Sequence, residues 1–384
     1  MNFQRLRDFL DYYLPMLEIP GTDTVIYQNH REIFRHTTGF DSIEKQTMLT
    51  PDRLYNIYSC SKIATAVAAL QLIERGEILA TDPVYAYFPE YKNLTVKVYG
   101  ENGNVTGIRP AEKQMLIQHL LTMTSGLNYD LDSPSIKAVV ASTGGKAPTL
   151  DVCRAIANEP LEFDPGEKYN YSLSLDVMAG IVELVSGEKF SDYMQNNVFA
   201  PLGMKETAYH VDESKRDRFA AHYEYIAGKG RGAEIPFESN RYRLGTEFDS
   251  GGAGVVSSVD DYILLIDALA NGGVGKTGER ILSSRSIDVM RTNALTPEQI
   301  KNQFAIHPYT HGYGYGYGVR MKLADTPSGI LASTGEFGWD GAKLCLAMAD
   351  PSINLAVFHA EHMGGLHSIV VPRLRNVIYA CLDD

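Results

Sequence analysis

The sequence lacks long apolar runs and is short of positive charge. No stretch of about eighteen or more apolar residues occurs, so the chain offers no candidate for a membrane-spanning helix. Its 35 Lys and Arg residues are outnumbered by 47 Asp and Glu residues, which leaves a net charge of −12. Because nucleic acids and anionic membranes attract basic surfaces, neither is expected as the main partner.

Cysteine is also scarce. The chain of 384 residues has only Cys60, Cys153, Cys345 and Cys381, with no Cys-x-x-Cys pair. This pattern predicts buried free thiols in a reducing compartment. Residues 1–18 predict an amphipathic helix with both charge signs, and they lack the apolar core and small-residue cleavage site of a signal peptide. We therefore expect a cytoplasmic protein.

One segment combines features that catalysis needs. Residues 54–74, LYNIYSCSKIATAVAALQLIE, start with a short apolar run and continue with apolar residues at helical spacing. Ser59 lies at the junction, and Lys62 follows one helical turn later on the same face. Serine needs a base to act as a nucleophile, and a partly desolvated lysine near the positive end of a helix dipole loses its proton near neutral pH. The pair therefore predicts a nucleophile and its base.

The Ser-x-x-Lys pattern alone does not identify Ser59 as the nucleophile, because the pattern occurs three times in the chain. Ser42–Lys45 lies in a polar segment, and Ser186–Lys189 resembles a helix stop, whereas Ser59–Lys62 opens a long amphipathic helix. The simpler interpretation of Ser59 is an ordinary helix N-cap, with Lys62 as a solvated charge. The neighbouring Cys60 points about 100° further round the helix, so it is expected in the core.

Strand-like segments lie at both ends of the chain, with helical patterns between them. Residues 24–39 predict a hairpin with its turn near Asn29 and His30, and further strands follow Gly312. We expect an α/β (α+β) fold, in which an antiparallel sheet flanked by helices on both faces receives an inserted, mainly helical domain.

The expected boundaries follow from this division. The sheet domain would comprise residues 1–58 and 250–384, the helical domain residues 59–249, and the active site would lie at their interface.

Six motifs occur in a fixed order along the chain: YSCSK, HLLTMTSGL, PGEKYNYS, GGAGVVSSVDDY, YGYGYG and GEFGWDGAKL. Their order and spacing resemble those of the serine β-lactamase-like superfamily, which includes class C β-lactamases, DD-peptidases, and related esterases and acyltransferases. The resemblance covers about residues 20 to 380 and is nearest to the family VIII carboxylesterases. It implies a β-lactamase/transpeptidase-like fold and a serine hydrolase that forms an acyl-enzyme without a cofactor.

The resemblance also implies roles for individual residues. Ser59 corresponds to the acylated nucleophile and Lys62 to its base. Tyr171 corresponds to the tyrosine of the Tyr-x-Asn motif, which passes a proton with the lysine, and a nearby ammonium is expected to lower the pKa of its phenol. Tyr169 is the rival by proximity, although a packing role suits it better. The backbone N–H groups of Ser59 and Ala342 would form the oxyanion hole.

The expected substrate-binding residues are Leu173, Trp339, Asp340 and Gly341, and the chain departs from the superfamily pattern at the first three of them. Leu173 replaces the asparagine that contacts an acylamino group, and Trp339 replaces the lysine that receives a carboxylate. Asp340 adds a negative charge that would repel a carboxylate. These departures favour hydrolysis of small, uncharged acyl esters, with acyl transfer as a variant, over β-lactam or D-Ala peptide cleavage.

The sequence leaves two other functions open. A β-lactamase or D-amino-acid peptidase is the first alternative, and a non-catalytic scaffold of the same fold is the second. No serine satisfies the Gly-x-Ser-x-Gly motif of an α/β-hydrolase. His359, Glu361, His362 and His367 suggest a metal site, but no matching acidic cluster accompanies them, so no metal or cofactor is expected. The expected partner is a small-molecule acyl substrate, and the oligomeric state stays open.

Overall fold

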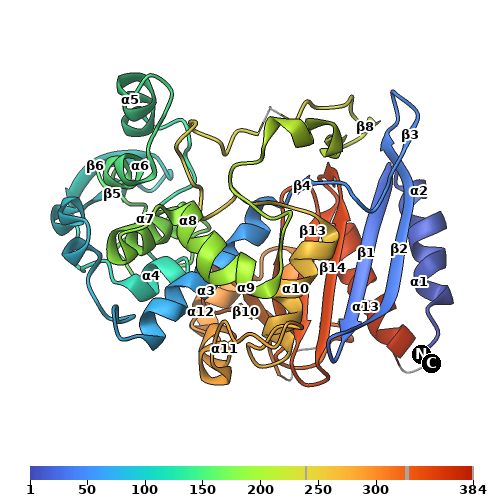
Figure 1. The fold of residues 1–384 in the computed structure, drawn as a ribbon. Helices are drawn as coiled ribbons and strands as arrows, with labels where there is room; N and C mark the ends of the chain where they lie inside the picture. Colours follow the sequence, from blue (N-terminus) through green and yellow to red (C-terminus); the bar gives the residue numbers. More distant parts are fainter. Residues whose placement is uncertain (238–239, 325–327, 383–384) are drawn as a thin grey trace.

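An eight-stranded antiparallel sheet forms the centre of the fold (Figure 1). The computed structural model describes residues 1–237, 240–324 and 328–382. The strand order is β10-β11-β12-β13-β14-β1-β2-β3. The strands are β10 (Tyr313–Tyr315), β11 (Arg320–Lys322), β12 (Phe337–Asp340), β13 (Cys345–Asp350), β14 (Leu355–Glu361), β1 (Gly21–Gln28), β2 (Arg31–Ser42) and β3 (Thr47–Met48). Both ends of the chain therefore build one sheet, as predicted.

The predicted hairpin is β1–β2, and its turn lies at the predicted residues. Asn29 and His30 have φ angles of 51° and 63°. Two consecutive residues with positive φ are what a tight hairpin turn requires, because that twist matches the twist of the flanking strands. β1 also pairs with β14, so the first and last strands of this sheet in chain order lie side by side within it.

Helices cover both faces of the sheet. The side chains of β1 and β13 alternate between two apolar clusters, with Val25 and Ala347 in one and Ile26 and Leu346 in the other. The first face packs against α10 (Val259–Ala270) and α3 (Ser61–Glu74). The second face packs against α1 (Gln4–Asp8) and α13 (His367–Leu382).

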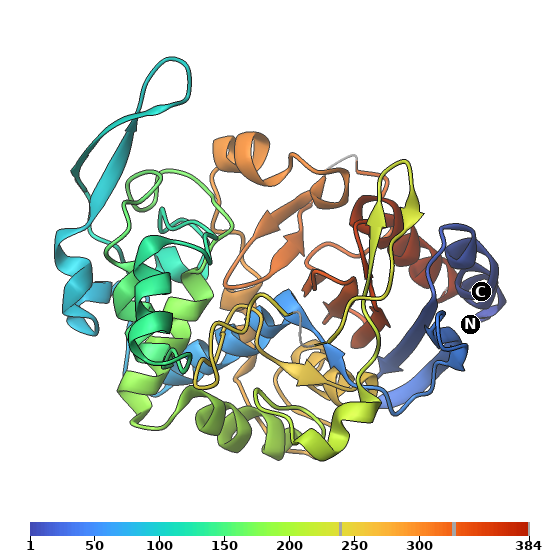
Figure 2. The ribbon, with the colours of Figure 1, turned by 90° about the horizontal axis from the view of Figure 1, so that it is seen from above.

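The other half of the molecule is mainly helical and lies beside the sheet (Figure 2). Its helices are α4 (Ile117–Leu121), α5 (Pro134–Ser142), α6 (Thr149–Ile156), α7 (Ser174–Ser186) and α8 (Phe190–Met194). A hairpin of β5 (Thr95–Tyr99) and β6 (Val105–Pro110) projects from it. One continuous apolar cluster runs from the sheet through α3 into α7. The division of the chain at residues 58/59 and 249/250 stays a prediction.

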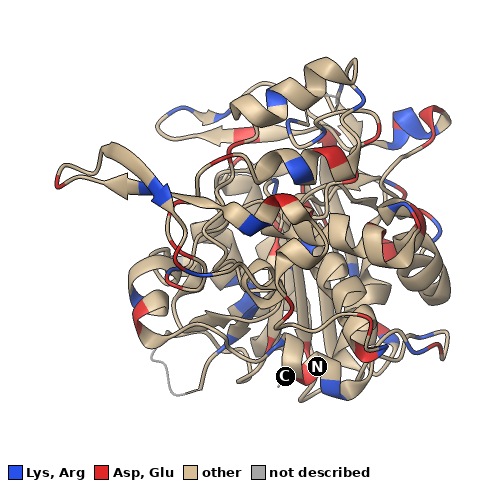
Figure 3. Cartoon of the chain, turned by 90° about the vertical axis from the view of Figure 1, so that its left-hand side faces the viewer, with Lys and Arg blue, Asp and Glu red and all other residues tan. Residues whose placement is uncertain are grey.

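Short elements complete the chain. They are α2 (Leu14–Met16), β4 (Tyr55–Asn56), α9 (Ala200–Leu202), β7 (Tyr223–Ile226), β8 (Gly230–Arg231), β9 (Val256–Ser257), α11 (Ser284–Met290), α12 (Pro297–Gln299) and β15 (Met363–Gly364), with a 3₁₀ turn η2 (Tyr58–Cys60). In the described part of the chain, no helix has the length and apolar character needed to cross a bilayer. Basic and acidic residues are interspersed on the side seen in Figure 3.

Candidate active site

Ser59 lies in the 3₁₀ turn η2, directly before α3, and its side chain borders a cavity. It is not the N-cap of that helix, because Cys60 occupies the N-cap position. The residue before it, Tyr58, has a φ of 46°, a left-handed conformation that costs energy for a residue with a bulky side chain. The Tyr58 hydroxyl contacts Nδ1 of His222 at 3.3 Å, and its ring packs against Tyr242. These contacts hold the strained turn that presents Ser59.

Lys62 is completely buried beneath Ser59. Its Nζ lies 3.2 Å from Ser59 Oγ, 3.3 Å from the hydroxyl of Tyr129 and 2.7 Å from the carbonyl oxygen of Gly252. Burial disfavours the ammonium form and lowers the pKa of Lys62 to about 7. A neutral amine beside a serine hydroxyl is therefore populated near neutral pH, which is what a general base needs.

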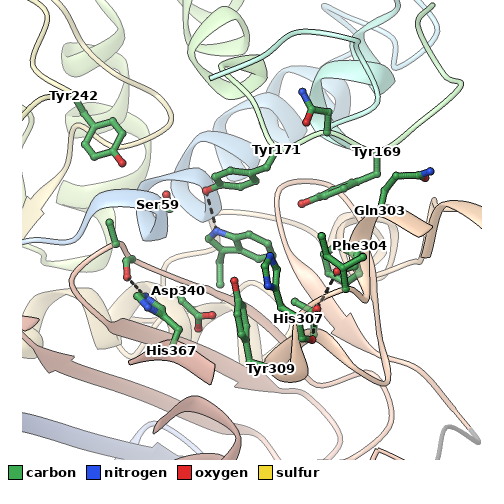
Figure 4. A pocket seen from close by; sticks show the side chains of 16 residues that line it. Ser59, Tyr169, Tyr171, Tyr242, Gln303, Phe304, His307, Tyr309, Asp340 and His367 are labelled. Carbon is green, nitrogen blue, oxygen red and sulfur yellow. Dashed lines mark hydrogen bonds between the residues drawn. The ribbon is translucent and has the colours of Figure 1, made fainter. Parts of the chain in front are cut away.

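Tyr171 stacks between two other aromatic rings, those of Tyr129 and Trp339, with centroids 5.5 Å away in each case. Its hydroxyl accepts a hydrogen bond of 3.1 Å from Nε1 of Trp339 and also interacts with Ser59 (Figure 4). The Nζ of Lys62 lies 4.6 Å from the centroid of the ring. The structure thus brings the side chains of Ser59, Lys62 and Tyr171 together.

The predicted direction of the Tyr171 pKa was wrong. Burial raises the pKa of Tyr171 well above its ordinary value, and this effect exceeds the opposing hydrogen bonds from Ser59 and Trp339. The phenol therefore stays protonated near neutral pH, and Lys62 is the group that can accept a proton. The rival Tyr169 packs edge-on against Phe304 and Tyr315, in agreement with a packing role.

The cavity beside Ser59 has a volume of about 410 Å³ (Figure 4). Its walls are largely aromatic and come from the helical half, the segment 303–310, β12 and the start of α13. The lining residues include Ser59, Tyr169, Asn170, Tyr171, Tyr242, Phe304, His307, Tyr309, Trp339, Asp340, Gly341, Ala342 and His367. Ser59 and Ala342, the two expected oxyanion-hole residues, therefore border the same space.

The residues Trp339-Asp340-Gly341 lie at the end of β12, in the interior of the sheet, and all three line the cavity. Asp340 does not carry an isolated negative charge, which corrects the expected repulsion of carboxylates. The guanidinium of Arg320, completely buried on the neighbouring strand β11, donates two hydrogen bonds to its carboxylate. Arg320 also keeps the pKa of Asp340 below its ordinary value against the effect of burial.

Leu173 does not border the cavity of Ser59. It is buried at the N-cap of α7 and lines a separate small pocket together with Leu127 and Asn128. Asn170 lines the main cavity instead, and its side-chain amide donates a 2.8 Å hydrogen bond to the carbonyl oxygen of Leu127. The expected substrate contact at Leu173 is therefore not supported by this arrangement.

Three residues of the site were given no catalytic role from the sequence, although Gly252 lies within the GGAGVVSSVDDY motif. Tyr129 and Gly252 contact Lys62 from a loop and from a glycine-rich turn that are distant in sequence. His367 begins α13 and contacts the carbonyl oxygen of Gly341 at 2.8 Å. Only the glycine-rich GGAG segment could have been suspected, because glycines mark places where the backbone comes close to another group.

Two of the residues that suggested a metal site, His359 and Glu361, do not line the cavity of Ser59. His359 and Glu361 are buried in the sheet and contact each other at 3.4 Å. The described residues contain no group of three or more His, Cys, Asp or Glu side chains able to hold a metal ion. All four cysteines are buried and free, and Cys60 lies in the core as predicted.

Comparisons with known proteins identify the family of the chain. A sequence model of the β-lactamase family, described as "Beta-lactamase", matches residues 6–360. Esterase EstB of Burkholderia gladioli is 26% identical over 401 residues, which cover 98% of this chain and 95% of that protein. Protein Rv1367c of Mycobacterium tuberculosis is 28% identical over 355 residues, which cover 89% of this chain and 85% of that protein.

Solved structures show the same fold. EstCE1, described as a hydrolase with promiscuous acyltransferase activity, superposes with a TM-score of 0.76 at 21% identity and covers 98% of both chains. A mutant of simvastatin synthase from Aspergillus terreus superposes with a TM-score of 0.81 at 21% identity, covering 100% of this chain and 99% of that one. The chain belongs to the β-lactamase family and is a serine hydrolase.

Proposed function

We propose that this protein is a carboxylesterase that cleaves small, uncharged acyl esters through an acyl-enzyme on Ser59. One observation carries the proposal. Ser59 Oγ lies 3.2 Å from the amine of a buried lysine whose pKa is about 7, at the edge of an aromatic cavity. A serine activated in this way can attack an ester carbonyl, and the cavity can hold the apolar acyl group.

The first half-reaction uses three side chains. Ser59 Oγ attacks the carbonyl carbon while its proton moves to Nζ of Lys62. The tetrahedral oxyanion is stabilised by the backbone N–H groups of Ser59 and Ala342. As the ester C–O bond breaks, the protonated Tyr171 gives its proton to the leaving alkoxide and regains one from Lys62.

In the second half-reaction, water attacks the acyl-enzyme carbonyl and gives a proton to Lys62. Ser59 Oγ then leaves and is reprotonated, which releases the carboxylic acid. Trp339 supports both halves, because its N–H donates to the Tyr171 oxygen and so directs the phenol hydrogen away from the indole.

The substrate class follows from what lines the cavity. Trp339 stands where β-lactamases and peptidases have a lysine, so this position offers no ammonium to a substrate carboxylate. The charge of Asp340 is offset by Arg320, so the preference for uncharged esters depends on the missing lysine and the aromatic walls rather than on repulsion. The names of EstB and EstCE1 support esterase activity, and that of EstCE1 also supports acyl transfer, in which an alcohol replaces water.

Parallel kinetics test the proposal. The values of kcat/KM are measured for p-nitrophenyl acetate, p-nitrophenyl butyrate, nitrocefin and a D-Ala-D-Ala peptide. We expect both esters to exceed nitrocefin and the peptide. A higher value for nitrocefin or the peptide would contradict the esterase assignment and favour a β-lactamase or peptidase, whereas no turnover of any substrate would favour the scaffold alternative.

The cytoplasmic location is part of the same proposal. Its support is the set of four free, buried thiols, which suits a reducing compartment. Cell fractionation that places the protein outside the cytoplasm would contradict it.

A further inference from the structure

A buried carboxylate that the mechanism above does not use lies near Lys62, on the other side of Gly252. Asp176 on α7 has an exposed fraction of 1%. Its Oδ1 accepts hydrogen bonds from Ser250 Oγ at 2.5 Å and from the backbone N–H of Gly252 at 3.2 Å. Its Oδ2 accepts no hydrogen bond from any residue that the structure describes. A buried carboxylate oxygen in this state is costly unless a positive charge faces it.

Gly252 separates Asp176 from Lys62 without a side chain. Its carbonyl oxygen accepts the 2.7 Å hydrogen bond from Lys62 Nζ, while its N–H donates to Asp176. A Cβ at this position would lie 2.6 Å from Oδ2 of Asp176 and 3.3 Å from Nζ of Lys62. The free carboxylate oxygen and the amine therefore border the same small space, which only a glycine leaves open.

We propose that Asp176 is a positioning residue for Lys62, whose carboxylate holds the amine beside Ser59 and stabilises the ammonium formed when Ser59 gives up its proton. The proposal rests on the function proposed above. Asp176 touches neither the substrate nor Ser59, and it acts through Lys62 and the Ser250–Gly252 turn.

The electrostatic consequence has a definite sign. Burial lowers the pKa of Lys62, and the charge of Asp176 opposes this effect. Burial likewise raises the pKa of Asp176, and the charge of Lys62 opposes that effect. An opposite charge within about 4–6 Å shifts a pKa by about 1–3 units toward the charged form. Without the carboxylate, the pKa of Lys62 falls further. The Lys62 amine is then unprotonated down to a lower pH, but it is a weaker base.

Other titratable groups face the pair from the surrounding elements. Cys60, Tyr129 and Tyr171 surround Lys62, and burial raises the pKa of each. Near Asp176, burial also raises the pKa values of Cys153 and Tyr209. These five groups are therefore uncharged across the neutral range.

One further ionisable pair lies beside the turn. His210 contacts Asp249, the residue before Ser250, at 2.6 Å. A His210→Gln variant therefore serves as a control for any titration that arises from this pair.

The experiment compares the wild type with Asp176→Asn. Asparagine has the same shape, keeps an oxygen for Ser250 and Gly252, and removes the charge. The rate of covalent labelling of Ser59 by a fluorophosphonate is measured from acidic to alkaline pH. We expect the midpoint of the acidic limb to fall by about one pH unit or more, with a lower plateau.

Matched controls separate this role from a structural one. Asp267→Asn removes another fully buried carboxylate, on α10, and should leave the midpoint unchanged, as should His210→Gln. If Asp176→Asn does not fold, the same measurement is made on Asp176→Ser, which also removes the charge and has a smaller side chain. An unchanged midpoint in a folded Asp176 variant would overturn the inference. Absence of labelling at Ser59 in the wild type would instead overturn the proposed function.

Discussion

Lys62 determines the pH range in which this protein can work. Its folded-state pKa of about 7 lies far below the ordinary lysine value of 10.5, because burial disfavours its charge. Only the neutral amine can take the proton of Ser59. We therefore expect kcat/KM for p-nitrophenyl butyrate to rise with pH and to level off above a single-proton midpoint near pH 7.

Substitution of Lys62 provides the complementary test. Lys62→Arg keeps a positive charge but cannot supply a neutral base, so kcat/KM should fall by about 10²–10⁴-fold at every pH. Lys301→Arg, an exposed lysine in the segment 300–304, is the matched control and should behave like the wild type. A midpoint that remains near pH 7 in Lys62→Arg would show that another group is the base.

At the scale of elements, the site depends on how closely the glycine-rich turn approaches α3. Gly252 has no positive φ, so alanine is compatible with its backbone, yet a Cβ there would press on both Asp176 and Lys62. We expect Gly252→Ala to displace the amine from Ser59 and to lower kcat by about 10²-fold or more, with a smaller change in KM.

Gly107→Ala is the control for this substitution. Gly107 lies on β6, and a Cβ there would meet no atom within 4 Å. The activity of the Gly107→Ala variant should equal that of the wild type. Full activity in Gly252→Ala would show that the close approach of this turn to Lys62 is not needed.

Elements with local signals were predictable from the sequence, whereas contacts between distant segments were not. The β1–β2 turn and helix α3 follow from hairpin chemistry and apolar periodicity, and the motif order indicated where Ser59, Lys62 and Tyr171 would meet. Arg320 was missed as the partner of Asp340 because strand pairing alone brings β11 beside β12. The role of Leu173 was assigned from its position in the motif. In the structure, Leu173 at the start of α7 lines a separate pocket instead.

At the scale of the whole molecule, a buried charge network joins the sheet to α13. Arg320 and Asp340 form one pair, and Glu336 joins Arg375 of α13 at 3.3 Å. Removing one partner of a buried pair leaves an uncompensated charge, so Arg320→Met should lower the free energy of unfolding by about 3–5 kcal/mol. Urea denaturation measures this loss, and a change below about 1 kcal/mol would contradict the assignment.

The same pair gives a pH dependence of stability with a definite sign. The folded pKa of Asp340 lies below its unfolded value because Arg320 favours the carboxylate. The contribution of Asp340 to folding stability is therefore fully present above its unfolded pKa of about 4. This contribution is lost as the pH falls through its folded pKa. The stability difference between the wild type and Asp340→Asn should shrink only in acid.

Detection of the acyl-enzyme tests the central claim most directly. The wild type and Ser59→Ala are mixed with p-nitrophenyl butyrate, quenched in acid within the first turnovers and analysed by intact and peptide mass spectrometry. We expect the wild type to gain one butyryl group on the peptide that contains Ser59, and Ser59→Ala to gain none there and to lose turnover. Full turnover by Ser59→Ala, or a butyryl group on another residue of the wild type, would contradict the account.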